Sequence, residues 1–298
     1  MTTDHVARIR RFNRLVTQRA GALDDHFLGR SRPLGASRLL FEIGADGADL
    51  LELRTRLGLD AGYVARLLRA LEKEGLVRSE PAAQDRRVRR AKLTAAGRRE
   101  LREMNRRSDR AAAELLAALP EPRRERLVGA MDEVRRLLLL ADLRVERVAP
   151  SSPTARWCLE RYFEELDRRF EHGFDPAATL PMEDRELMPP RGVFLVASAD
   201  GEALACGGVR TLAKGIGYLK RMWVAEAMRG LGLGRAMLEA LEGHSRALGH
   251  RILRLETNDA LQEAIALYRS AGFREVSAFN DEPFARHWFE KDLRTARS

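Results

Sequence analysis

The run Arg229–Arg235, "RGLGLGR", combines residue types that can hold a phosphate group. Its three glycines, Gly230, Gly232 and Gly234, stand at alternate positions, and the helical pattern "AMLEALEGHSRALG" follows them. Glycine lets several backbone N–H groups approach one ligand closely, and the dipole of a helix N-terminus favours negative charge there. We therefore expect this loop to bind a pyrophosphate.

The spacing of the glycines excludes two common phosphate loops. A P-loop needs Gly-x-x-x-x-Gly-Lys followed by Ser or Thr, and no such lysine is present here. The dinucleotide fingerprint Gly-x-Gly-x-x-Gly fails because the glycines alternate and no early strand–helix–strand unit carries the required acidic residue.

The loop and its surroundings resemble the GNAT acetyltransferases, whose signature is Gln/Arg-x-x-Gly-x-Gly/Ala. Arg229–Gly234 meets that signature, and the similarity extends through "LKRMWV" before it and "LETN…EAIALYRSAGF" after it, over most of residues 150–294. The resemblance implies acetyl-CoA as the acetyl donor. The contacts that it implies are the backbone of Met222, Trp223 and Val224 for the pantetheine arm and thioester carbonyl, Arg229, Gly230, Leu231, Gly232, Leu233, Gly234 and Arg235 for the pyrophosphate, and Asn258 beside the pantetheine.

The chemistry of acetyl transfer to an amine assigns roles to a few side chains. Tyr268 matches the family's tyrosine beside the thioester sulfur, where a phenol can protonate the departing thiolate. Relatives often carry Glu in place of Tyr218, so the general base stays open between Tyr218, Glu256 and a chain of waters. No cysteine lies in the matched motifs, which favours direct transfer over an acetyl-enzyme.

Two segments are expected to wall the acceptor site, "RYFEELDRRFEHGFD" and "FNDEPFARHWFEKDL". Aromatic residues alternate in them with polar ones, a mixture that suits a small amine or amino acid. The aromatic residues are Phe170, Phe174, Phe284 and Trp288, and the polar ones are Glu165, Arg169, Asn280 and His287.

The positive charge of the chain belongs to its first half. Residues 1–148 carry 32 Lys and Arg against 22 Asp and Glu, whereas residues 149–298 carry 21 against 22. Clustered positive charge favours nucleic acid, because neutralising phosphates releases condensed counterions. Coding bias explains the preference for Arg (48) over Lys (5) but not this asymmetry.

The first half contains a helix-turn-helix pattern. A short helix over Leu50–Leu57 is followed by a turn and by a second helix in "AGYVARLLRALEKEG", with Asp60 as its expected N-cap. Such a pair places its second helix in the major groove, and a basic hairpin behind it reaches an adjacent minor groove. The expected DNA-binding residues are Tyr63, Arg66 and Arg69 on the helix and Arg86, Arg87 and Arg89 in the hairpin.

This half resembles the MarR family of winged-helix regulators over about residues 5–142. The family's wing carries Asp-x-Arg and then Leu-Thr-x-x-Gly, and "DRRVRRAKLTAAG" has Asp85, Arg87, Leu93, Thr94 and Gly97 at the matching places. The resemblance implies a homodimer joined through the terminal helices and bound to a double-stranded DNA operator.

The expected architecture has two domains. A mostly α winged helix-turn-helix domain over 1–145 is followed by a linker at 146–153 and by an α/β mixed-sheet domain over 154–298. No apolar run is long enough to span a bilayer, no secretory signal is present, and Cys158 and Cys206 have no metal-binding spacing. We therefore expect a cytoplasmic protein without membrane contact or metal.

These observations predict a transcriptional regulator that is also an N-acetyltransferase for a small amine or amino acid. The competing hypothesis is a pure regulator whose second domain only senses acetyl-CoA or an amine. A third is an enzyme whose winged helix serves only for dimerisation.

Overall fold

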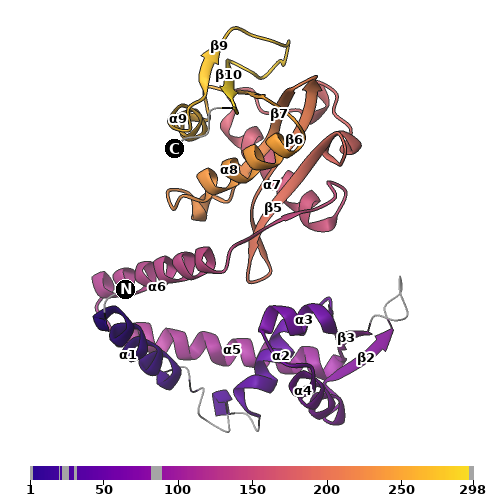
Figure 1. Cartoon of the computed structure of the whole chain (residues 1–298). Coiled ribbons are helices and arrows are strands. Elements are labelled where there is room, and N and C mark those ends of the chain that lie inside the picture. The colour runs from indigo at the N-terminus through magenta and orange to yellow at the C-terminus, as the bar shows by residue number, and fades with distance from the viewer. Residues whose placement is uncertain (1–2, 20, 22–26, 30–31, 82–88, 295–298) are drawn as a thin grey trace. The chain divides into compact units, whose positions relative to one another are not determined.

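A computed structural model describes residues 3–19, 21, 27–29, 32–81 and 89–294. The chain folds into two compact units, Met1–Val128 and Gly129–Ser298, and Figure 1 labels most of their helices and strands. The predicted hairpin residues Asp85, Arg86 and Arg87 lie outside the described residues.

The first unit is mostly helical, as its sequence predicts. Its elements are α1 (Thr3–Arg19), η1 (Phe27–Gly29), α2 (Leu34–Ile43), β1 (Ala48–Asp49), α3 (Leu50–Leu57), α4 (Ala61–Lys73), β2 (Val77–Pro81), β3 (Arg89–Leu93), α5 (Ala95–Ala117) and α6 (Glu121–Ala141), the last of which continues into the second unit. The three strands form one small antiparallel sheet in the order β1-β3-β2. The core of this unit joins α2, α4 and the sheet through leucines such as Leu39, Leu40 and Leu71.

Two local features favour the helix-turn-helix: a glycine at the end of its first helix and a side-chain cap at the start of its second. Gly58 ends α3 in the left-handed conformation, with φ of 61°, which glycine adopts without steric cost. Asp60 caps α4 by accepting a hydrogen bond from the Tyr63 N–H at 2.8 Å. Every fourth or third residue of α4 from Val64 to Leu71 is buried, so one face packs and the other is left for solvent.

The second unit is a seven-stranded mixed sheet with helices on both faces. Its elements are β4 (Arg144–Arg147), α7 (Pro153–Arg169), η2 (Pro176–Ala178), η3 (Asp184–Leu187), β5 (Gly192–Ala199), β6 (Glu202–Ala213), β7 (Ile216–Val224), η4 (Glu226–Met228), α8 (Leu233–Ala247), β8 (Ile252–Thr257), α9 (Gln262–Ser270), β9 (Arg274–Val276) and β10 (His287–Asp292). The strand order is β4-β5-β6-β7-β8-β10-β9, and only the β7–β8 pair is parallel. This arrangement confirms the predicted mixed α/β sheet.

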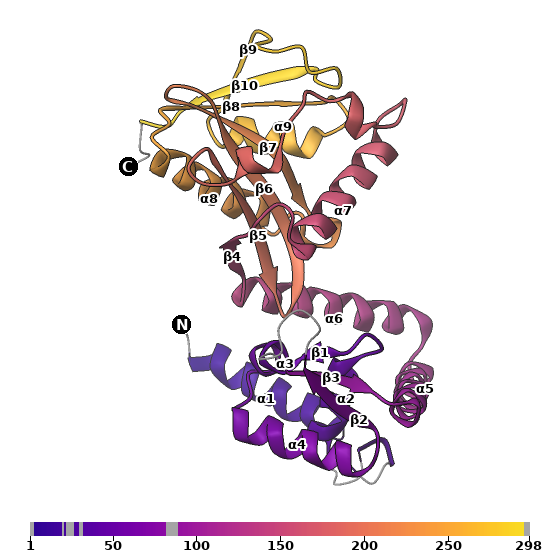
Figure 2. The ribbon, with the colours of Figure 1, turned by 90° about the vertical axis from the view of Figure 1, so that its right-hand side faces the viewer.

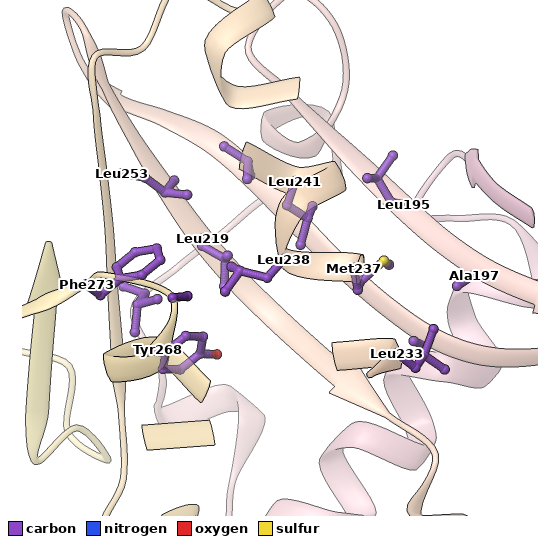
Figure 3. Close-up of a cluster of buried hydrophobic side chains, with 14 of the residues drawn as sticks. Leu195, Ala197, Leu219, Leu233, Met237, Leu238, Leu241, Leu253, Tyr268 and Phe273 are labelled. Carbon is purple, nitrogen blue, oxygen red and sulfur yellow. The ribbon is translucent and has the colours of Figure 1, made fainter. Parts of the chain in front are cut away.

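Alternate residues of β5 divide the core of the second unit between two faces. Val193, Leu195 and Ala197 pack with α8 in one cluster, which Figure 3 shows together with Leu238 and Leu241. Phe194 and Val196 pack with α7 in the other, which also contains the buried Cys158 and Cys206. Since successive side chains of a strand point to opposite faces, α7 and α8 cover opposite sides of the sheet (Figure 2).

Candidate active site and nucleic-acid interface

The sheet of the second unit opens between its two parallel strands. The pairing of β7 with β8 runs from Ile216 to Tyr218 only, although β7 continues to Val224. Pairing with β6 shifts register between Cys206 and Gly208, and Arg221 opposite this shift has a φ of +57°. The strands therefore part after Tyr218, and a bulge of this kind then bends β7 and re-aims its side chains.

The backbone of β7 beyond the bulge turns polar groups toward the opening. The Ala225 N–H donates to the Leu204 carbonyl on β6. Because N–H and C=O directions alternate along an antiparallel strand, those of Val224 and Met222 point away from β6. The Val224 carbonyl accordingly accepts hydrogen bonds from Arg229 Nε at 3.1 Å and from Arg229 Nη2 at 3.0 Å.

A first cavity of about 550 Å³ is lined by α7, the end of β7, α9 and the glycine loop. It gathers most of the residues predicted to bind coenzyme A. Those lining it are Met222, Trp223, Val224, Arg229, Gly230, Gly232, Gly234, Arg235 and Tyr268. The remaining predicted loop residues face the protein interior instead: Leu233 is buried in the core and Leu231 packs against it.

The glycine loop leaves the N-terminus of α8 open to this cavity. Gly230 and Gly232 have φ of 74° and 85°, and no atom lies within 4 Å of where a Cβ would stand on either. No side chain caps α8 at Gly232, so its first N–H groups lie available for an anion. The residues therefore fit the pyrophosphate of coenzyme A.

A network of charged side chains surrounds the mouth of the loop. The buried Glu165 of α7 contacts the Arg229 guanidinium and accepts from the Trp223 indole N–H at 3.0 Å and from Arg169 at 3.1 Å. Arg229 is thus braced by a carboxylate and a carbonyl, while Arg235 donates to Ser270 Oγ at 2.6 Å. Sequence reasoning expected Glu165 and Arg169 beside the acceptor; they line the first cavity.

Tyr268 lies where the first cavity meets a second one. Its ring packs on Phe273 and Phe289, while its hydroxyl points away from Phe273 and reaches the Met222 sulfur at 4.0 Å (Figure 3). Burial, and next the nearby Glu256, raise the pKa of Tyr268 above its usual value of 10. The phenol therefore keeps its proton at neutral pH and can donate it.

The second cavity, of about 120 Å³, combines acidic, basic and aromatic side chains. Tyr162, Met222 and Tyr268 line both cavities. The other side chains that matter for its chemistry are Phe163, Phe170, Phe174, Phe284, Lys220, Arg221, Glu256, Asn258 and Glu282. Three of the predicted aromatic residues are thus at this site; Trp288 and His287 do not line it.

Lys220 holds two buried carboxylates at the floor of the second cavity. Its ammonium lies 2.5 Å from Glu256 Oε1 and 3.2 Å from Glu282 Oε2, and each glutamate side chain is only 6% exposed. Among the described residues, Glu256 Oε2 and Glu282 Oε1 are buried with no hydrogen-bond partner. Sequence reasoning missed Glu282, because no motif marks the loop that carries it.

Tyr218 and Asn258 have structural partners of their own. The Tyr218 hydroxyl accepts from Asn280 Nδ2 at 2.6 Å, and Tyr218 lines neither cavity. Burial, and next the charge of Glu256, raise the pKa of this phenol. Asn258 lines the second cavity, where its amide donates to the Phe284 carbonyl at 2.7 Å.

The exposed face of α4 in the first unit carries the predicted basic residues. Arg66 and Arg69 are exposed, and Arg66 lies over the Tyr63 ring at 5.5 Å. Tyr63 is half-buried against α2, since a Cβ on Gly35 would lie 2.6 Å from its hydroxyl. Arg89 is exposed at the start of β3.

The second half of the chain matches known acetyltransferases. Residues 159–273 match the sequence model of the Acetyltransferase (GNAT) family. An IAA acetyltransferase of Azospirillum brasilense is 36% identical to this chain over 117 residues, which cover 39% of this chain and 76% of that protein. The chain belongs to the GNAT acetyltransferase family. An aminoglycoside N(6')-acetyltransferase type 1 of Stenotrophomonas maltophilia is 32% identical over 35% of this chain and 75% of its own length.

Further matches complete the description of both halves. A solved GNAT-family acetyltransferase of Staphylococcus aureus is 17% identical, with a TM-score of 0.45, over 51% of this chain and 99% of that one. Residues 38–88 match the MarR family. The chain is therefore a MarR–GNAT fusion, in which the N-acetyltransferase domain uses acetyl-CoA as acetyl donor.

Neither a metal-binding cluster nor a membrane-spanning helix is present among the described residues. No group of three or more potential metal-binding side chains comes together there. No helix in the same ranges has the length and apolar character needed to cross a bilayer.

Proposed function

We propose that this protein transfers acetyl from acetyl-CoA directly to a small amine or amino acid, and that its MarR-like half regulates transcription from a double-stranded DNA operator. The observation that carries the catalytic part is the junction of the two cavities at Tyr162, Met222 and Tyr268. A donor in the first cavity and an amine in the second would meet beside the Tyr268 hydroxyl. Neither needs to leave its cavity, which supports transfer within one ternary complex.

The residues at the junction supply the proton transfers. Glu256 takes a proton from the attacking amine, since it lines the acceptor cavity and has an oxygen without a hydrogen-bond partner among the described residues. Tyr268 gives its proton to the departing sulfur. Outward-facing N–H groups of β7 stabilise the negative charge that develops on the carbonyl oxygen. Acetyl-CoA supplies the activated acetyl group.

Glu256 is a better base than Tyr218. The Tyr218 pKa is raised, so this phenol holds its proton at neutral pH, and it lines neither cavity. In this proposal Glu256, on the neighbouring β8, supplies the carboxylate that Tyr218 on β7 lacks.

The regulatory part of the proposal assigns DNA binding and dimerisation to the first half and acetyl transfer to the second. The expected boundary at 145 and linker at 146–153 overlap β4 (Arg144–Arg147), which pairs with β5 in the sheet of the second unit. Exposed Arg66, Arg69 and Arg89 suit contact with DNA phosphates and bases. The apolar face of α1 has the exposed side chains Ile9 (60%), Phe12 (49%) and Leu15 (53%). Such a face suits a homodimer contact, because a monomer rarely leaves a stripe of this kind in water. We place the protein in the cytoplasm, where acetyl-CoA and DNA are both present.

A panel of amines tests the catalytic part. The full chain is incubated with acetyl-CoA and with amino acids, polyamines and aminoglycosides in turn; free thiol and acetylated product are measured. We expect stoichiometric thiol and N-acetyl product with at least one small amine. Acetyl-CoA binding without turnover on any amine would instead favour a sensor domain.

A further inference from the structure

Arg221 is a cation at the second cavity that has no partner of opposite charge. Among the described residues, its guanidinium makes no hydrogen bond or ion pair, and it lies over the Phe163 ring, 5.8 Å from the ring centroid. The acidic Asp184 is near but is already paired with Arg156 at 2.5 Å. A partly buried guanidinium without an anion is costly, so a carboxylate or similar anion is expected to bind there.

The bulge in β7 is what brings Arg221 to this cavity. In a regular strand the side chains of Lys220 and Arg221 point to opposite faces, yet both line the second cavity here. The φ of +57° at Arg221 is unfavourable for a residue with a side chain. Strained backbone of this kind is found where a side chain must be aimed at a ligand.

The carboxylates of the same cavity carry an excess of negative charge. Glu256 and Glu282 share the single ammonium of Lys220, which leaves one negative charge when both are ionised. Each has a buried oxygen with no hydrogen-bond partner in the described ranges. A second ammonium group, from a ligand, would satisfy both the charge and these two acceptors.

Aromatic side chains form much of the remaining wall, which also includes Thr179, Thr257 and Asn258. Phe163 stacks on Phe174 at 5.8 Å, and Phe174 meets Phe284 at 4.8 Å and Phe170 at 5.7 Å. With a volume of about 120 Å³, the cavity admits a small side chain without polar groups.

We propose that the acceptor is a small apolar α-amino acid, whose carboxylate binds Arg221 and whose ammonium group binds between Glu256 and Glu282. This inference rests on the proposed acetyl transfer and names its substrate class. Once bound, the ammonium passes one proton to Glu282, and the neutral amine nitrogen faces the junction with the donor cavity. Glu256 takes the second proton as the amine attacks, and Tyr268 protonates the departing sulfur. Arg221 is then a specificity-determining residue that does not touch the reacting atoms.

Binding to the complex of the full chain with coenzyme A tests this without requiring turnover. The probes are alanine, valine, leucine, isoleucine, methionine and phenylalanine, each compared with its amide by titration calorimetry. We expect at least one acid to bind about 10- to 100-fold tighter than its amide, the range of a lost charge-assisted hydrogen bond. In Arg221→Gln that preference should disappear, and Arg221→Lys should retain part of it.

Arg168→Gln is the matched control, because Arg168 lies on α7 with an exposed side chain and lines neither cavity. It should bind acid and amide as the wild type does, and all variants should bind coenzyme A normally. Amides that bind as tightly as acids, or no binding by any acid, would overturn the inference even if other amines are acetylated. Acids that bind through Arg221 but release no thiol from acetyl-CoA would instead overturn the proposed activity.

Discussion

Two candidate bases lie within one hydrogen-bonded group, yet their surroundings separate them. Lys220 contacts Glu256 at 2.5 Å and the Tyr218 hydroxyl at 3.5 Å. Glu256 is on the cavity side of this group, and Tyr218 is behind it, against Asn280. The position on the cavity wall, more than the kind of side chain, decides which residue can take a proton from an amine.

Substitution of each residue in turn tests whether Glu256 is the general base. Glu256→Gln keeps the shape but cannot accept the amine proton, so we expect kcat to fall about 100-fold or more. Its affinity for acetyl-CoA should hold, because Glu256 does not line the first cavity. Tyr218→Phe should lose less than about 10-fold, through loosened packing alone. Steady-state kinetics with an accepted amine check this, and an equal or larger loss in Tyr218→Phe would reverse the roles.

At the scale of elements, the Leu-Thr-x-x-Gly motif joins the wing to α5. Thr94 caps α5 by accepting from the Gly97 N–H at 3.0 Å, and its hydroxyl donates to the Gly75 carbonyl at 2.7 Å. Position 97 requires glycine because the Leu76 backbone lies close to it: a Cβ there would lie 2.0 Å from the Leu76 carbonyl oxygen. One threonine and one glycine therefore fix the end of α4, the wing and the start of α5 together.

Gly97→Ala should loosen the first unit. The forced shift of the Leu76 backbone costs about 1–3 kcal/mol, as for other overpacked sites. Amide hydrogen exchange in α4, β2 and α5, read by mass spectrometry, should speed up correspondingly. Gly129→Ala is the control, because Gly129 is exposed in α6 and a Cβ there meets nothing within 4 Å. Unchanged exchange in Gly97→Ala would contradict the close contact.

In the second unit, His287 ties β10 to neighbouring segments in a pH-dependent way. Its ring nitrogens lie 2.5 Å from Glu275 on β9 and 2.7 Å from Asp259 after β8. These carboxylates, Glu275 first, raise the pKa of His287 above 6.5. A raised pKa stabilises the fold below pH 6.5, and this contribution is lost as pH rises through the folded-state value.

The melting temperature of His287→Gln should therefore fall below that of the wild type at pH 5.5. The gap should narrow as the pH rises past the folded pKa of His287. Thermal unfolding of both proteins in matched buffers from pH 5.5 to 8.5 measures it. A gap that widens with pH would mean that the neutral imidazole is the stabilising form.

Sequence patterns predicted the elements well and the acceptor site only in part. The glycine loop was recognisable because the spacing of its glycines marks a local backbone conformation. In the first unit, Leu50–Leu57 with Gly58 and Asp60 predicted α3, its turn and the cap of α4. The role of Arg221 depends on a one-residue bulge, which no local pattern in "LKRMWV" shows. Glu282 becomes part of the site only through the fold, 62 residues after Lys220.

At the scale of the whole molecule, the positive net charge lies in the MarR half, and the two cavities proposed to bind donor and acceptor lie in the GNAT half. DNA binding by the full chain should weaken with salt, since each phosphate contact releases a counterion. Arg66→Ala and Arg69→Ala should each reduce the slope of log K against log salt by about one. Gel shifts on DNA flanking its gene measure this, with the exposed Arg126→Ala as control. Binding that is absent, or insensitive to salt, would leave the first half as a dimerisation platform.

The central claim is that acetyl passes to an amine at the junction of the two cavities, beside Tyr268. The most direct measurement is thiol release from acetyl-CoA by Tyr268→Phe, with acetyl-CoA binding followed in parallel. Loss of one hydroxyl should leave the apolar packing and the donor affinity in place while kcat falls about 100-fold or more, because the departing thiolate loses its proton donor. Wild-type turnover in Tyr268→Phe, with donor binding intact, would contradict the account.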